Sequence, residues 1–351
     1  AFAVGGYMMR FLKSPLGVTM LFTGLILAFQ FTEYAGTMRE IGLLVLLAIS
    51  TFFIHELGHV VFGIVAGYQF HFLTAGPITI ERNRITANSS WAYFGGIASC
   101  SPKTDDLQKI SRQHFLFAAG GPILSIVVAI LSLTVGYFFN LQYVQFLGVM
   151  NFVIFLVTAI PFKGEFKSDG RVMLELLSKG NEKEQFLSTL LLIKEMMSPA
   201  LPNMWSLHLI QQARTAPVNE DNITVSYLLF YYDLCTADFE TAIKAIDSYK
   251  ALPVTKKNKM TMQFVTHMKQ VDAVMQGQAT VEQLRKLHSM MMPIEPISFK
   301  RSEWMMAKLA GNEALATKKL AEHRVQIEQG KKQYGFYVAE EKLTDLIELK
   351  L

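Results

Sequence analysis

The stretch IGLLVLLAISTFFIHELGHVVFGIVA, residues 41–66, is apolar along almost its whole length and contains the pentapeptide HELGH at residues 55–59. Its ionisable side chains are those of His55, Glu56 and His59. Histidines four residues apart on a helix share one face, so both imidazoles can reach one metal ion, with the glutamate close enough to act on a water there. An ionisable group in the middle of a membrane span costs about 2.5 to 3.5 kcal/mol on insertion scales. Three of them together therefore predict a bound metal.

The composition around this stretch indicates a membrane protein. Of the 351 residues, 51% are hydrophobic and 18% are charged, below the roughly 25% charged residues usual for soluble domains. Four segments are apolar and long enough to cross a hydrocarbon core of about 30 Å: Leu16 to Phe31, Ile41 to Ala66, Phe115 to Phe139, and Tyr143 to Phe162. We predict two domains, a transmembrane domain over residues 1–180 and a cytosolic α-helical domain over residues 181–351.

The predicted fold class is an all-α membrane protein with about four transmembrane helices and a small β-hairpin insertion. Residues 76–87, GPITIERNRITA, alternate apolar and polar residues around a turn near Asn83, which predicts the hairpin. In the C-terminal half, Tyr227 to Leu252 and Trp304 to Glu328 each read as a helix hairpin, with turns near residues 237–238 and 311–312. They resemble tetratricopeptide-like helix pairs with an irregular period.

The distribution of basic residues predicts the orientation in the membrane. Arg10 and Lys13 precede the first predicted span, and the connection between the third and fourth spans carries no basic residue. The connection between the second and third spans carries Arg82, Arg84, Lys103, Lys109 and Arg112. Because cytoplasmic connections are enriched in Lys and Arg, both termini are expected in the cytoplasm. No basic stripe with interleaved aromatic residues occurs, so no nucleic-acid partner is expected.

A third metal ligand must come from outside HELGH, because catalytic zinc normally takes three protein ligands. The best candidate is Asp169 in the segment IPFKGEFKSDG, residues 160–170, directly after the fourth predicted span. Its Pro and Gly residues oppose continuation of the helix, and irregular backbone at membrane depth is tolerated where it lines a wet cavity. The alternative for Asp169 is an Asx-type turn, because Ser-Asp-Gly is a good turn sequence.

These features resemble the site-two protease family of intramembrane zinc metalloproteases. The resemblance covers about residues 41–177: a histidine pair on one transmembrane helix, a later Asp-Gly aspartate, and Gly120-Gly121-Pro122, which is similar to the family's Gly-Pro motif. It implies an intramembrane zinc metalloendopeptidase that cleaves transmembrane segments, leader peptides or small membrane peptides near the cytoplasmic face. A multi-pass protein of the bacterial plasma membrane is the expected setting, by analogy.

The resemblance also implies roles for individual residues. His55, His59 and Asp169 become the Zn²⁺ ligands, and Glu56 becomes the general base and later the general acid. The chemistry supports these roles independently, because zinc can bring the pKa of a bound water down to about 7 and a carboxylate can take its proton.

Candidate substrate contacts are Gly121 and Pro122, Asn151 in the fourth predicted span, and Thr79 in the hairpin. The resemblance suggests that the hairpin provides an edge strand that pairs with an extended peptide. The alternative for the hairpin is an ordinary connection. For Asn151 the alternative is a hydrogen bond to another helix.

Two departures from the family pattern leave open which polar groups grip the substrate. Where the family often has Asn, this chain has Thr158 and Ser125. One alternative function is therefore a non-catalytic membrane scaffold or peptide-binding receptor of the same fold. A second is a small-molecule transporter, which the strict spacing of the motif and the lack of an internal repeat disfavour. The expected partners are a membrane-embedded peptide or single-span protein, the lipid bilayer, and a cytosolic partner at the C-terminal helical domain.

Overall fold

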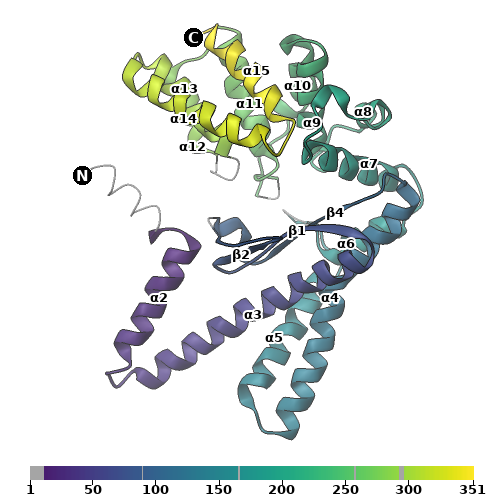
Figure 1. The fold of residues 1–351 in the computed structure, drawn as a ribbon, viewed down its shortest axis with the longest axis vertical. Helices are drawn as coiled ribbons and strands as arrows, with labels where there is room; N and C mark the ends of the chain where they lie inside the picture. Colours follow the sequence, from purple (N-terminus) through teal and green to yellow (C-terminus); the bar gives the residue numbers. More distant parts are fainter. Residues whose placement is uncertain (1–11, 89, 165–166, 257, 292–295) are drawn as a thin grey trace. The chain divides into compact units, whose positions relative to one another are not determined.

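The computed structural model of the chain describes residues 12–88, 90–164, 167–256, 258–291 and 296–351 (Figure 1). Arg10, which entered the orientation argument, and Glu165 and Phe166, which belong to the segment before Asp169, lie outside the described residues. The chain forms two compact units, Ala1–Lys179 and Gly180–Leu351, here called the membrane unit and the C-terminal unit.

The membrane unit contains the apolar helices. Three of them are long and apolar enough to cross a membrane by length and composition, namely α3 (Ala35–Val65), α4 (Leu107–Phe138) and α5 (Gln142–Ala159). The first predicted span corresponds to α2 (Pro15–Phe29), an apolar helix of 15 residues. At 1.5 Å per residue such a helix is roughly 22 Å long, which is less than the hydrocarbon core. A short helix, α6 (Asp169–Leu177), follows α5.

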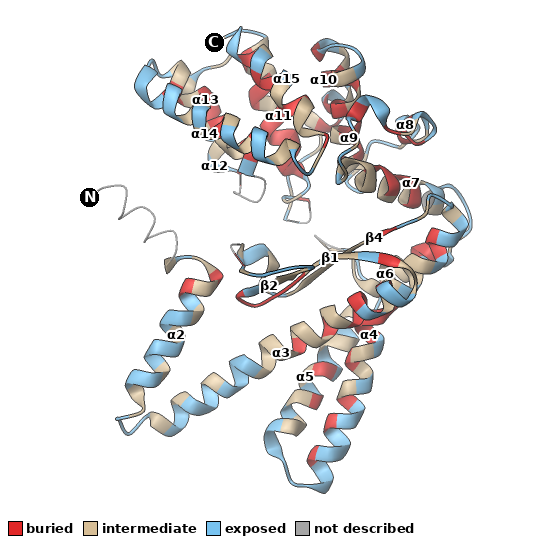
Figure 2. Ribbon diagram, viewed as in Figure 1, coloured by how far each residue is buried: buried red, intermediate tan, exposed pale blue. Residues whose placement is uncertain are grey.

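The burial pattern of these helices is the reverse of that in a soluble bundle. Large apolar side chains are exposed on their outer faces, for example Leu46 (59%), Leu131 (59%) and Val157 (65%) (Figure 2). Polar side chains lie inside instead, because a lipid solvent penalises them. Asn151 is fully buried, and its Nδ2 donates to the carbonyl of Leu147 at 2.9 Å.

Close packing between α3 and α4 depends on glycine. A Cβ atom on Gly58 would overlap the carbonyl oxygen of Gly120, and one on Gly120 would overlap the carbonyl oxygen of Gly58. Small residues let membrane helices approach at backbone distance, where van der Waals contact and not hydrophobicity holds them together. The glycine inside HELGH is therefore the point at which α3 meets α4.

A four-stranded antiparallel sheet lies between α3 and α4 in the chain, with strand order β3-β2-β1-β4. The strands are β1 (Tyr68–Ala75), β2 (Ile78–Glu81), β3 (Ile85–Ala87) and β4 (Ile97–Pro102), with a 3₁₀ turn, η1 (Trp91–Tyr93), before β4. Leu73 of β1 lies opposite Ile80 of β2 and Ala98 of β4. The predicted hairpin is β2–β3, but the sheet is larger than that hairpin, because β1 pairs with β2 and β4 pairs with β1 on the same side of it.

The C-terminal unit is helical, and none of its described helices meets the criterion for a membrane span. Its helices are α7 (Asn181–Met196), α8 (Leu207–Arg214), α9 (Ile223–Thr236), α10 (Phe239–Lys250), α11 (Met262–Met275), α12 (Val281–Ser289), α13 (Pro296–Leu309), α14 (Glu313–Lys331) and α15 (Tyr337–Glu348), with a 3₁₀ turn, η2 (Pro202–Met204). The two predicted turns fall between α9 and α10 and between α13 and α14.

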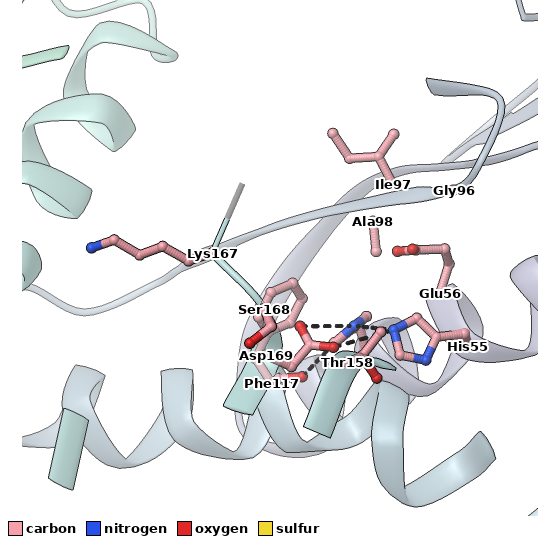
Figure 3. A pocket seen from close by; sticks show the side chains of 11 residues that line it. His55, Glu56, Gly96, Ile97, Ala98, Phe117, Thr158, Lys167, Ser168 and Asp169 are labelled. Carbon is pink, nitrogen blue, oxygen red and sulfur yellow. Dashed lines mark hydrogen bonds and ion pairs between the residues drawn. The ribbon is translucent and has the colours of Figure 1, made fainter. Parts of the chain in front are cut away.

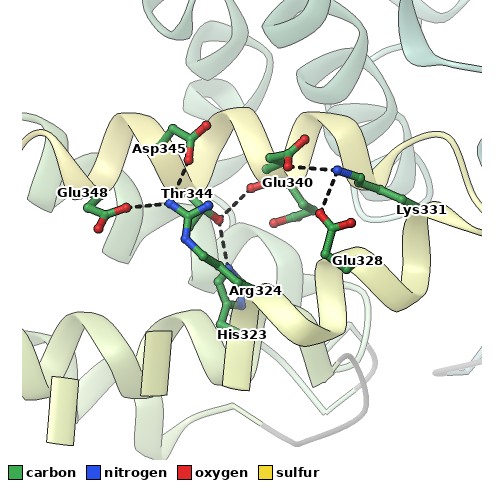
Figure 4. Close-up of polar contacts among 9 residues, drawn as sticks. His323, Arg324, Glu328, Lys331, Glu340, Thr344, Asp345 and Glu348 are labelled. Carbon is green, nitrogen blue, oxygen red and sulfur yellow. Dashed lines mark hydrogen bonds and ion pairs between the residues drawn. The ribbon is translucent and has the colours of Figure 1, made fainter. Parts of the chain in front are cut away.

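An ion pair is fully buried in the core of the C-terminal unit. Arg301 of α13 donates through Nη1 to Glu340 of α15, and both side chains are at most 1% exposed. The hydroxyl of Tyr231 donates to Oε1 of Glu340 at 2.6 Å, which links α9 to the pair. A matched surface pair lies nearby, where Arg324 of α14 contacts Asp345 and remains 40% exposed (Figure 4).

The two arginines should differ in their effect on stability. Arg301→Met leaves the Glu340 carboxylate buried without its partner, and we expect it to lower the free energy of unfolding by about 3 to 5 kcal/mol. Arg324→Met removes a solvated pair and should cost less than about 1 kcal/mol. Denaturant unfolding of the purified full chain, followed by tryptophan fluorescence, measures both. Equal losses for the two variants would contradict the assignment of Arg301 to the core.

Candidate metal centre

Three side chains come together next to α4: those of His55 and His59 from α3 and that of Asp169 from α6 (Figure 3). Nε2 of His55 lies 3.2 Å from Oδ2 of Asp169, and Nε2 of His59 lies 3.4 Å from Oδ1 of the same carboxylate. The two Nε2 atoms are 3.2 Å apart. Both histidines are buried on one face of α3, and the Asp169 side chain is 21% exposed.

The spacing of these atoms fits zinc. Zinc binds histidine nitrogen and carboxylate oxygen at about 2.0 to 2.2 Å in a tetrahedron, so two ligand atoms are expected roughly 3.3 to 3.5 Å apart. The two Nε2 atoms are 3.2 Å apart, and each lies 3.2 to 3.4 Å from its nearer Asp169 oxygen, Oδ2 for His55 and Oδ1 for His59, so these distances are close to the tetrahedral edge. His55, His59 and Asp169 are also the one group of His, Cys, Asp or Glu within the described residues whose ligand atoms gather this closely.

Each imidazole is held through its other ring nitrogen. Nδ1 of His55 lies 3.0 Å from Oγ of Ser125, and Nδ1 of His59 lies 2.8 Å from the carbonyl oxygen of Phe117. Both acceptors are on α4. Contacts of this kind fix the ring plane and leave Nε2 free to bind a metal.

Asp169 is positioned by the residue before it. Ser168 caps α6 by accepting from the backbone N–H of Arg171 at 3.2 Å, and its hydroxyl donates to the carbonyl of Ile160 at 2.8 Å. The loop after α5 is therefore closed on itself, and Asp169 is the first residue of a helix and not part of an Asx turn. Burial raises the pKa of Asp169, but hydrogen bonds to His55 and His59 outweigh it and lower the pKa to about 2. The carboxylate is ionised at neutral pH, as a metal ligand must be.

Glu56 lies beside the three ligand atoms in a cavity of about 290 Å³ (Figure 3). The wall next to Glu56 consists of Gly96 and the first two residues of β4, Ile97 and Ala98. A Cβ atom on Gly96 would lie 2.7 Å from Oε1 of Glu56, so the backbone of this segment rests directly on the glutamate side chain. The arrangement places a carboxylate, a candidate metal position and an extended backbone around one small space.

Gly121 lies against both imidazoles. A Cβ atom there would overlap Nε2 of His59 and would lie 2.7 Å from Cε1 of His55. Pro122 follows it inside α4 and is buried. Gly121 therefore packs against the ligating edge of His59 and against the ring of His55.

The other predicted substrate contacts are not among the residues that line this cavity. Asn151 lies between α5 and α3, where its Nδ2 is 3.5 Å from Oγ1 of Thr51. Thr79 is in β2, and its hydroxyl is 2.9 Å from that of Thr74. Thr158 does line the cavity, with its hydroxyl donating to the carbonyl of Ile154 at 2.9 Å.

Two groups at the site carry no sequence signal that identified them. The carbonyl of Phe117 is a backbone atom, so any residue could supply it. The β4 wall, Gly96 to Ala98, is apolar, and only the adjacent glycines Gly95 and Gly96 mark a place where backbone approaches something closely. Ser125 was noticed as a departure from a family pattern, but its contact with His55 depends on the helix crossing.

Comparison with known proteins gives a family match. The model of peptidase family M50 matches residues 42–310, which is most of the chain and includes all three candidate ligands. No curated protein and no solved structure matches the chain.

Replacing Gly121 tests how closely the two imidazoles pack against α4. Gly121→Ala should displace both imidazoles, because its methyl group has no room, and bound zinc should fall from about one per chain to a small fraction of that. Gly24→Ala is the matched control, since a Cβ atom there meets nothing within 4 Å. Elemental analysis of the detergent-purified proteins measures the zinc. Full zinc content in Gly121→Ala would show that the imidazoles are not held against α4.

Proposed function

Because the chain belongs to peptidase family M50, whose members are membrane metallopeptidases of the site-2 protease type, we propose that it is an intramembrane zinc endopeptidase. Its substrates are transmembrane segments, leader peptides or small membrane peptides. His55, His59 and Asp169 hold the zinc. The observation that carries the proposal is the group of three donor side chains, with closest contacts of 3.2 to 3.4 Å between them, beside Glu56 in one cavity.

The chemistry divides between the metal and the glutamate. Zinc, when bound, acidifies a water molecule and polarises the scissile carbonyl group. The Glu56 carboxylate takes a proton from the attacking water and returns it to the nitrogen of the leaving amine. Its position on α3 next to His55 keeps it within the same cavity without making it a ligand.

The substrate backbone binds along β4. A peptide bond within a helix is shielded by its own hydrogen bonds, so the substrate must be extended before water can attack. Within the described part of the chain β4 pairs with β1 alone, and its first residues line the cavity beside Glu56. Thr79 is a less suitable contact than predicted, because β2 is paired on both sides, by β1 and β3, and offers no free edge.

The orientation and setting are part of the same proposal. The basic residues Lys103, Lys109 and Arg112 beside the start of α4 support a cytoplasmic location for this end of the bundle. Cleavage would then occur near the cytoplasmic face, with both termini in the cytoplasm of a bacterial cell. The C-terminal unit would meet a cytosolic partner.

Glu56→Gln separates catalysis from metal binding. The amide cannot accept the proton from water, so we expect cleavage to fall by at least about 100-fold, while zinc stays near the wild-type level because no ligand is lost. His59→Ala and Asp169→Ala remove ligands and should lose both zinc and cleavage. The assay uses proteoliposomes with a panel of single-span peptides, and mass spectrometry identifies the products.

Two results would contradict the proposal. Near-normal cleavage by Glu56→Gln would exclude the glutamate as the base. A wild-type protein that holds zinc and retains the peptides uncut would instead be the scaffold or receptor.

A further inference from the structure

The two histidines of the candidate metal centre are oriented by acceptors of different kinds. Nδ1 of His59 faces a backbone carbonyl, that of Phe117, whereas Nδ1 of His55 faces a side-chain hydroxyl, that of Ser125. A carbonyl oxygen can only accept, so it fixes the proton of His59 on Nδ1. A hydroxyl can accept or donate, and the carbonyl oxygen of Gly121 also interacts with the His55 imidazole. Ser125 is therefore the side-chain part of the contact that holds this ring on α4.

Ser125 is placed for this contact by the α3–α4 crossing. It lies four residues after Gly121 on α4, and residues four apart share a helix face. The His55 ring therefore spans one turn of α4, with Cε1 against Gly121 and Nδ1 against Ser125. Ser125 is 0% exposed within an apolar bundle, where a hydroxyl costs free energy unless it is paired. The contact with His55 accounts for its burial.

We propose that Ser125 is a positioning residue for the zinc ligand His55, and that its effect is on zinc affinity and not on binding of the substrate. The inference rests on the proposed function for the presence of zinc. With the Nδ1 proton donated to Ser125 Oγ, the lone pair of Nε2 faces His59 and Asp169. Without the hydroxyl, the ring loses a contact that holds its plane and samples other rotamers, and zinc binding must first select one of them.

This role differs from the one that the family pattern suggested for the position. Because Ser125 stands where the family often has asparagine, the sequence suggested that this position affects how the substrate is bound. The Ser125 side chain is fully buried behind His55 and is not among the residues that line the cavity. It therefore reaches the substrate only through the ligand that it holds.

The test compares Ser125→Ala, Ser125→Thr and Ser132→Ala in the full chain in detergent. Ser132 is the matched control, a buried serine seven residues further along α4 on the same face. Competition with a chromogenic chelator measures the zinc dissociation constant. We expect Ser125→Ala to bind zinc about 10- to 100-fold more weakly, Ser125→Thr to stay close to wild type because it keeps the hydroxyl, and Ser132→Ala to be unchanged. The visible absorption of the cobalt-loaded proteins should change in Ser125→Ala alone.

The outcomes that overturn the inference are distinct from failure of the proposed function. Zinc affinity of Ser125→Ala equal to that of Ser132→Ala would overturn it. So would a raised KM for peptide with unchanged zinc affinity, because that result would place Ser125 in substrate binding. A wild-type protein that binds zinc but cleaves no peptide would refute the protease proposal and leave the affinity comparison valid.

Discussion

The membrane unit depends on one constraint: His55, His59 and Asp169 must share one point inside an apolar bundle. Each of these side chains alone would be costly in hydrocarbon, and together they contact one another and form a group that could hold a metal ion. Two glycines at the crossing, Gly58 and Gly120, let α3 and α4 approach until the imidazoles rest on α4. The polar centre therefore depends on the close packing of α3 against α4.

The rest of the membrane unit brings further groups to that point. Ser168 closes the loop after α5, so that α6 begins at Asp169 and the carboxylate faces the histidines. The sheet lies over α3, where Leu73 of β1 and Val60 of α3 belong to one hydrophobic cluster. Because β4 pairs with β1, this packing fixes the distance between β4 and Glu56 on α3. Five elements, α3, α4, α5, α6 and β4, thus meet around a cavity that none of them could form alone.

The C-terminal unit follows the rules of water-soluble proteins. Its core contains residues such as Phe230, Ile246 and Trp304, and its one fully buried ion pair among the described residues joins Arg301 to Glu340. A buried pair of this kind is weak evidence for stability but makes the fold sensitive to loss of either partner. The family match extends to residue 310 and so includes helices α7 to α13 of this unit, whereas α14 and α15 lie beyond it. Most of the helices of the C-terminal unit are in this sense part of the family pattern.

The sequence by itself determined the features that local spacing encodes. The interval between His55 and His59 places them on one helix face, apolar length identifies α3, α4 and α5, and the alternation around Asn83 identifies the β2–β3 hairpin. Asp169 was selected by chemistry, since zinc needs a third ligand, and its position after a span. Tertiary structure alone decided that Ser125 and the Phe117 carbonyl hold the imidazoles, and that β4, not the strand of Thr79, borders Glu56. The physical reason is that these contacts join residues 58 to 70 positions apart, or about 40 for β4 and Glu56, and depend on how closely two helices approach, which no local pattern records.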